Sequence, residues 1–246
     1  ARGCYSAHSE IKRLNRLAEN TLLMAEKFAC IAKLLNGLPY PKKDFERAWE
    51  NLLFCQFHDI LAGTSIQEAY FDVRNFLGES LSIASKILYK SLYAIASKID
   101  TSKFPGLPII VFNPASWRTV FPVEVEFNFG GNFIIVDDEG KPVPFQRIKP
   151  STTLRCYLEC SRARVVFVAD VPPLGYRVYW VQPCEKKPVF SSDLKVSDNV
   201  LENKYFRVEL DPFTGWITSI YDKRHDVEVL KEPIKPVVID DPSDTW

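Results

Sequence analysis

The chain has 246 residues with 31 basic and 31 acidic side chains, so its formal net charge at pH 7 is zero. This balance excludes the broad electrostatic attraction that nonspecific binding to nucleic acids or anionic membranes requires. A composition of 46% hydrophobic and 25% charged residues is typical of globular domains. The sequence has no apolar stretch near the roughly 20 residues that a membrane span needs, and charges at residues 10–13 argue against a signal peptide.

The six cysteines contain no Cys-x-x-Cys pair, and Cys30 and Cys55 fall within helical apolar patterns. Cys156 and Cys160 are four residues apart, which on a strand separates them by about 13 Å, too far for a direct disulfide. The sequence also contains no Asn-x-Ser/Thr sequon. We therefore expect buried free thiols at Cys30 and Cys55 and a reducing, cytoplasmic setting.

Amino-acid usage changes abruptly near residue 104. Residues 1–104 contain 12 alanines and one valine, whereas residues 105–246 contain three alanines and 20 valines. Alanine favours helices, and β-branched residues favour strands. The sequence thus predicts an α+β protein of two domains: a helical domain over residues 1–104 and an all-β domain over residues 105–246.

Three helices are predicted in the first domain. Apolar residues recur every three or four positions over residues 11–35, and a second helix is predicted over residues 44–57. The third, over residues 65–99, opens with Ser65 and Glu68 in the form of a capping box. Two long helices with a shorter one between them predict an antiparallel three-helix bundle.

Short runs rich in β-branched and aromatic residues, separated by turn signals, predict the strands of the second domain. These runs cover residues 109–112, 120–127, 133–136, 154–159, 163–168, 176–181 and 205–210. Many short strands without helices between them predict an antiparallel β-sandwich. The final residues supply no closing element, so we expect the chain to contain only part of that sandwich.

Common signatures of phosphate, dinucleotide and metalloprotease sites are absent from the sequence. His8 and His225 stand in polar surroundings and are expected at the surface. His58, followed by Asp59, lies where one predicted helix ends and the next begins. It is either a histidine stabilised at a helix C-terminus or a residue that projects with Asp59 into a functional site.

The segment around this pair resembles a known family. Gln56-Phe57-His58-Asp59-Ile60-Leu61-Ala62-Gly63-Thr64-Ser65 is similar to a conserved segment of glycoside hydrolase family 38, the class II α-mannosidases. Three further stretches resemble the same family in the same order, within residues 2–19, 111–117 and 201–223. Ala62 departs from the family pattern, in which a proline is common, and this difference should affect only the turn.

The resemblance implies a zinc-dependent retaining α-mannosidase that hydrolyses terminal α-mannosides. Such enzymes comprise an α/β catalytic domain, a three-helix domain and a large β domain. Here the resemblance covers the three-helix domain and the start of the β domain. It implies that His58 is a zinc ligand and that Asp59 contacts substrate hydroxyls. The catalytic domain, the nucleophile and the other zinc ligands match nothing in the chain, so we expect no catalytic residue here and no activity from the chain alone.

Two other interpretations remain open at this point. In the first alternative, the chain is a non-enzymatic carbohydrate-binding or assembly module, as its clustered aromatic residues and neutral charge suggest. In the second, it is a self-associating homo-oligomer, because the surface that meets a catalytic domain would be apolar. The expected partners are a mannoside substrate, the N-terminal catalytic domain that the chain does not match, and further copies of the chain in a homo-oligomer. No nucleic acid and no membrane is expected as a partner.

Overall fold

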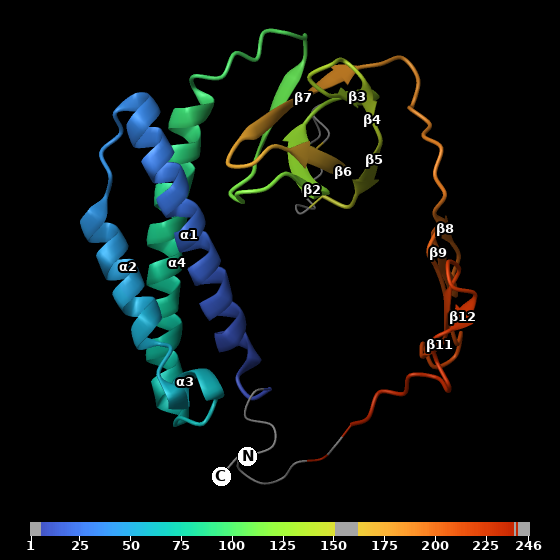
Figure 1. Cartoon of the computed structure of the whole chain (residues 1–246), viewed down its shortest axis with the longest axis horizontal. Coiled ribbons are helices and arrows are strands. Elements are labelled where there is room, and N and C mark those ends of the chain that lie inside the picture. The colour runs from blue at the N-terminus through green and yellow to red at the C-terminus, as the bar shows by residue number, and fades with distance from the viewer. Residues whose placement is uncertain (1–5, 151–161, 239, 241–246) are drawn as a thin grey trace. The chain divides into compact units, whose positions relative to one another are not determined.

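The structure, a computed structural model, describes residues 6–150, 162–238 and 240 (Figure 1). The chain forms two compact units that divide between Lys187 and Pro188. Among the described residues, none of the helices has the length and apolarity that crossing a membrane demands. The strand predicted over residues 154–159, together with Cys4, Cys156 and Cys160, lies outside the described residues.

The first unit begins with the helical part of the chain. Its helices are α1 (Ser9–Asn36), α2 (Lys42–Phe54), α3 (His58–Ala62) and α4 (Gln67–Ala96). Helices α1 and α2 run antiparallel, and α4 packs against both of them (Figure 1). The three long helices lie where the sequence predicts them. The described helical part nevertheless contains a fourth helix, because the chain turns after Phe54 and forms five residues of α3 before α4 begins.

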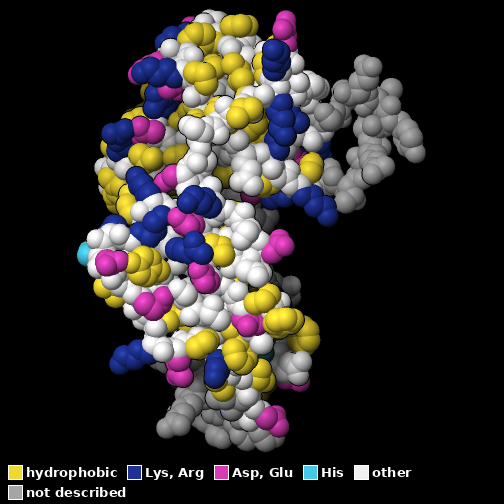
Figure 2. Space-filling model, turned by 90° about the vertical axis from the view of Figure 1, so that its right-hand side faces the viewer, with side chains coloured by type: hydrophobic (Ala, Val, Ile, Leu, Met, Phe, Trp, Pro, Cys, Tyr) yellow, Lys and Arg dark blue, Asp and Glu magenta, His cyan; other side chains and the backbone are white. Residues whose placement is uncertain are grey.

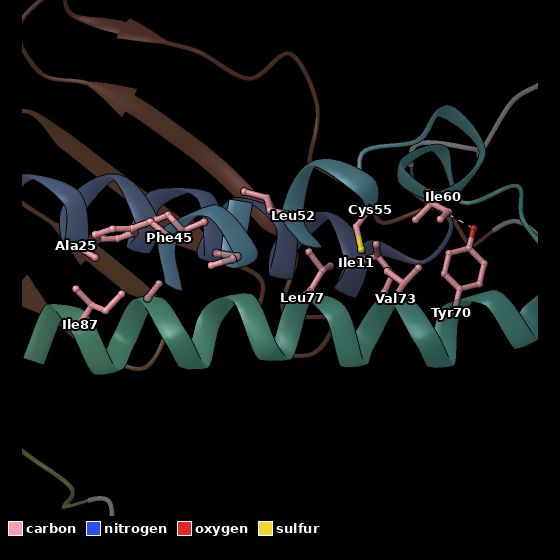
Figure 3. Packing of buried hydrophobic residues seen from close by; sticks show 14 of the residues in the cluster. Ile11, Ala25, Phe45, Leu52, Cys55, Ile60, Tyr70, Val73, Leu77 and Ile87 are labelled. Carbon is pink, nitrogen blue, oxygen red and sulfur yellow. Dashed lines mark hydrogen bonds between the residues drawn. The ribbon is translucent and has the colours of Figure 1, made fainter. Parts of the chain in front are cut away.

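The three long helices enclose an apolar core (Figure 3). Residues three, four or seven positions apart on each helix point inward, as the periodicity predicts. Representative members that are 0–3% exposed are Ile11 and Leu22 of α1, Phe45 and Leu52 of α2, and Val73 and Leu77 of α4.

The start of α4 differs from the predicted capping box. The residue that caps α4 is Ile66, and it makes no side-chain hydrogen bond to the helix. Ser65 instead donates its backbone N–H to the hydroxyl oxygen of Tyr70, at 3.1 Å. The capping-box prediction is therefore wrong: the helix begins one residue too late for the Ser65 side chain to cap it, and a tyrosine hydroxyl serves the Ser65 backbone.

Two antiparallel sheets complete the first unit. One has the order β1 (Leu107–Phe112), β7 (Tyr176–Pro183), β3 (Phe133–Val136) and β4 (Pro142–Val143), and the other β2 (Thr119–Asn128), β6 (Arg162–Val171) and β5 (Phe145–Ile148). Every second residue of β6, from Ala163 to Val171, is buried against Phe133 and Ile135 of β3. This alternation makes the pair of sheets a β-sandwich, as predicted.

A direct joint connects the helices to the sandwich within this unit. Lys27 of α1 donates a hydrogen bond to the carbonyl oxygen of Pro114, at 3.0 Å. The rings of Phe28 and Phe112 meet edge to face, with centroids 5.6 Å apart. These contacts fix α1 against the end of β1.

The second unit is a five-stranded antiparallel sheet. Its strands, in spatial order, are β12 (Val227–Glu228), β11 (Ile217–Asp222), β10 (Phe206–Leu210), β9 (Val200–Glu202) and β8 (Lys195–Val196). None of the described residues from Pro188 onward is fully buried. The β region predicted as one domain, residues 105–246, thus contributes to both units, and the predicted boundary at residues 104/105 stays a prediction.

Charged side chains are mixed over the surface. On the face that Figure 2 shows, lysines and arginines alternate with aspartates and glutamates, and no large area carries a single sign. This distribution agrees with the zero net charge of the sequence.

Candidate functional site

Helix α3, which begins at His58, lies at one end of the helical bundle, where the chain passes from α2 to α4 (Figure 1). Three residues in a turn separate His58 from the end of α2. The interpretation that His58 ends a helix and is stabilised there by the helix dipole is therefore wrong. The His58 side chain is 78% exposed and that of Asp59 is 40% exposed, so both groups are open to binding from outside.

A pocket of about 460 Å³ opens beside the pair. His58 and Leu61 line it from α3, and Lys12 and Arg16 line it from α1. Gln56, also in the lining, donates a hydrogen bond to the side-chain oxygen of Asn15, at 3.3 Å. The imidazole therefore lines an opening at the surface and does not lie in the apolar interior of the bundle.

The imidazole and the carboxylate lie side by side. His58 Nε2 is 3.5 Å from Asp59 Oδ2, and the second carboxylate oxygen of Asp59 accepts a hydrogen bond from Thr64 Oγ1, at 3.3 Å. The ring of Phe57 packs on the other side of His58, with centroids 4.1 Å apart. These contacts orient a nitrogen donor and an oxygen acceptor toward the same region of the surface.

The segment that carries the pair is closed by a glycine. Gly63 ends α3 with a φ of +90°, a conformation that glycine adopts at little cost. A Cβ atom at Gly63 would lie 2.9 Å from both the Cβ and the carbonyl oxygen of Ala7. The Thr64 N–H then bonds to the carbonyl oxygen of Asp59, at 2.9 Å. A glycine is thus required both by the turn and by the close approach of the chain segment that precedes α1.

His8 and Tyr70 complete the surroundings of this segment. Their rings stack with centroids 3.8 Å apart and planes inclined by 19°. His8 is half-buried, so its predicted position as a freely solvated surface residue is wrong, whereas His225 is 68% exposed. Tyr70 is completely buried.

His58 and Asp59 could supply only some of the ligands that a metal ion needs. Zinc takes about four ligands, and a catalytic zinc keeps one position open. Among the described residues, no three His, Cys, Asp or Glu side chains are grouped closely enough to hold a metal ion. The exposed imidazole of His58 fits one ligand position of such an ion, and Asp59 supplies an adjacent carboxylate. Any other ligands would come from outside the described residues.

The fold of this chain, a helical bundle joined to antiparallel sheets, also occurs in solved structures. A solved structure with this fold is a protein of glycosyl hydrolase family 38 from Enterococcus faecalis. It is 21% identical, covers 92% of this chain and 30% of its own, and superposes with a TM-score of 0.75.

Sequence comparisons find similarity to α-mannosidases. Residues 1–95 match the model of the alpha mannosidase middle domain. The lysosomal alpha-mannosidase of Bos taurus is 26% identical over 240 residues, which are 89% of this chain and 22% of that protein. An alpha-mannosidase of Saccharomyces cerevisiae is 39% identical over 135 residues, 54% of this chain and 12% of that protein.

These matches confirm the resemblance on which the sequence analysis relies. Residues 1–95, which cover the helical part of the chain, match the alpha mannosidase middle domain, and the chain is similar to α-mannosidases over most of its length. The chain spans less than a quarter of the length of either relative.

Proposed function

We propose that this chain acts as part of an α-mannosidase, a glycosidase that hydrolyses terminal α-mannosides with retention of configuration. The observation that carries the proposal is the exposed His58–Asp59 pair beside a pocket at the end of an alpha mannosidase middle domain. A retaining glycosidase needs two carboxyl groups about 5–5.5 Å apart across the scissile bond. We propose that both come from outside this chain.

In this proposal each member of the pair has a separate task. His58 supplies one imidazole nitrogen to a divalent ion, and its ring is kept in place by Phe57. Asp59 accepts hydrogen bonds from sugar hydroxyls and thereby orients the mannose ring. When bound, zinc would supply Lewis-acid and template chemistry beside the sugar. Ligation by His58 would also attach the bundle to the domain that holds the remaining ligands, so metal affinity would add to interdomain stability.

The proposal predicts that the isolated chain has no α-mannosidase activity. The purified 246-residue polypeptide, incubated with zinc and an aryl α-mannoside, is expected to release no mannose above the uncatalysed rate. Mannose release in proportion to the amount of this chain would contradict the proposal. Saturable binding of mannose or mannobiose without any metal would instead favour a carbohydrate-binding module.

The role of His58 is tested in the polypeptide that contains these residues together with a complete α-mannosidase catalytic domain. His58→Ala is expected to lower metal content and kcat/KM at least tenfold, the usual size of such losses at metal sites. His225→Ala is a matched control, because His225 is 68% exposed and 2.9 Å from a neighbouring carboxylate, that of Asp222. Equal metal content in the two variants would show that His58 is not a ligand.

We also propose a cytoplasmic setting, although the related bovine protein is named lysosomal. Support comes from Cys30, Cys55 and Cys184, which are free thiols. Fractionation of cells that express the tagged protein tests this proposal, and recovery in a lysosomal or secreted fraction would contradict it.

A further inference from the structure

We propose that Tyr70 is a positioning residue whose buried hydroxyl fixes the segment carrying His58 and Asp59. This inference rests on the proposed function, because it assigns to Tyr70 the task of holding that pair in its binding geometry. Tyr70 is expected neither to touch substrate nor to bind the metal ion. It acts through the backbone of α3 and of the turn that follows α3.

The hydroxyl of Tyr70 connects the two ends of the segment. It accepts a hydrogen bond from the backbone N–H of Ser65, at 3.1 Å, at the C-terminal end. Its single proton is shared between the carbonyl oxygens of Asp59, at 3.3 Å, and Ile60, at 3.4 Å, near the N-terminal end. Figure 3 shows the hydroxyl pointing toward Ile60 from its place at the start of α4. One oxygen atom therefore ties residues 59, 60 and 65 together.

The ring of Tyr70 is itself held on a rigid support. It projects from the first turns of the 30-residue helix α4 and is 0% exposed. The His8 ring stacks on it, and the guanidinium of Arg74 donates to its backbone carbonyl oxygen, at 3.4 Å. A side chain locked by packing positions neighbouring groups more precisely than a mobile one does. Tyr70 thereby fixes the position of His58 and Asp59 relative to helix α4.

A tyrosine that only packs in the core and a tyrosine that positions the segment predict different effects of substitution by phenylalanine. If the Tyr70 ring only filled space in the core, its replacement by phenylalanine would remove the hydrogen bonds of the hydroxyl but would not change the positions of His58 and Asp59. If the hydroxyl positions the segment, phenylalanine keeps the packing and releases residues 59–65. Tyr70→Phe therefore separates the two roles.

Tyr179 provides a matched control. It is 2% exposed, and its hydroxyl accepts a hydrogen bond from the backbone N–H of Asp170, at 3.0 Å, within the β-sandwich. Tyr179→Phe thus removes a comparable buried hydroxyl far from α3 in the sequence. A general loss of stability would appear in both variants, whereas a local effect on residues 58–65 would appear only in Tyr70→Phe.

The first measurement is hydrogen exchange of the full 246-residue chain by mass spectrometry. Peptides covering residues 57–66 are expected to exchange at least about fivefold faster in Tyr70→Phe, since the loss of even one of its hydrogen bonds has an effect of about this size. The same peptides are expected to be unchanged in Tyr179→Phe. Equal exchange of these peptides in the two variants would overturn the positioning role, whatever His58 does.

The second measurement is metal affinity in the polypeptide with a complete catalytic domain. Tyr70→Phe is expected to lower it on the order of tenfold, and to have no further effect when His58 is already alanine. Unchanged affinity in Tyr70→Phe, with a clear loss in His58→Ala, would overturn the inference. Unchanged affinity in His58→Ala with faster exchange in Tyr70→Phe would contradict the proposed function alone and leave the positioning of the segment supported.

Discussion

One buried amide holds together the entrance to the β-sandwich. Asn113 is 1% exposed, and its side-chain nitrogen lies 2.8 Å, 3.0 Å and 3.3 Å from the carbonyl oxygens of Trp117, Pro172 and Val171. Its side-chain oxygen accepts the N–H of Ala115, at 2.9 Å. The stretch over residues 111–117, one of those that resemble the family, is thereby explained as a structural element: it joins β1 to the chain that follows β6.

Replacement of Asn113 by alanine should destabilise the first unit. The change leaves buried carbonyl oxygens without their donor, which costs roughly 2–3 kcal/mol of unfolding free energy. Asn132→Ala is the control, since Asn132 is exposed and donates a single bond, to the carbonyl oxygen of Glu185. Chemical denaturation of both variants checks the prediction, and losses of equal size would contradict it.

Burial sets the reactivity of one thiol. Cys55 is 0% exposed, and burial raises its pKa to about 11, so the reactive thiolate is scarce at neutral pH. Cys30, predicted to be buried, is exposed. We expect iodoacetamide at pH 8 to modify Cys30 long before Cys55, as followed by peptide mass spectrometry. Denaturation should abolish the difference, and equal rates in the native chain would show that Cys55 is accessible.

At the scale of elements, sequence periodicity predicts the long helices because each repeats its apolar pattern over several turns. Helix α3 has only five residues, too few to show a period, and the sequence assigns its residues to the connection between two predicted helices. The predicted capping box fails for a related reason. The pattern of Ser65 and Glu68 is local, whereas the partner that Ser65 uses, the Tyr70 hydroxyl, is set by tertiary packing.

The sequence predicts which residues form the candidate site, but not the contacts that hold them in place. The sequence identifies His58 and Asp59 through their similarity to a family segment, and they lie together at an opening. The contacts that support the segment could not be predicted. Ala7 meets Gly63 and His8 stacks on Tyr70 across more than 50 residues of sequence, and no periodic pattern connects such positions.

Packing along α4 should dominate the stability of the bundle. Leu77 is 0% exposed and belongs to the core shared by the three long helices. Leu77→Ala is expected to lower the unfolding free energy by about 2–5 kcal/mol, because it removes buried methyl groups and leaves a cavity. Leu34→Ala on α1 should change it by less than about 0.5 kcal/mol, since Leu34 is 84% exposed. Thermal or urea unfolding of the two variants checks the prediction. Equal losses of unfolding free energy in both would contradict it and indicate a loosely packed core.

At the scale of the whole molecule, the two units are stabilised in different ways. The first has apolar cores in its bundle and its sandwich. In the second, carboxylates organise the turns between strands. Asp211 accepts the N–H groups of Phe213 and Thr214, and Asp222 pairs with His225 and Arg224. Glu228 likewise accepts two backbone N–H groups.

These bonds make the stability of the second unit depend on pH. They lower the folded-state pKa of Asp211, Asp222 and Glu228, for Asp222 chiefly through its bond to His225. A carboxyl with a lowered folded pKa contributes stability above its unfolded pKa, about 4, and loses it as pH falls through the folded pKa.

Acidification below about pH 4 should therefore weaken this unit. Asp222→Asn is expected to flatten the dependence of the unfolding temperature on pH in that range, as measured by calorimetry from pH 7 downward. The exposed Asp198, replaced by asparagine, serves as the control. An equal slope in wild type and Asp222→Asn would refute the contribution of this carboxylate.

The contact of Ala7 with Gly63 and the stacking of His8 on Tyr70 have a practical consequence for protein engineering. A tag, linker or fluorescent fusion inserted among residues 6–8 would disturb the imidazole of His58, some 50 positions away in the chain. Labels intended to leave that imidazole unperturbed belong elsewhere, for example in the exposed stretch at residues 185–187.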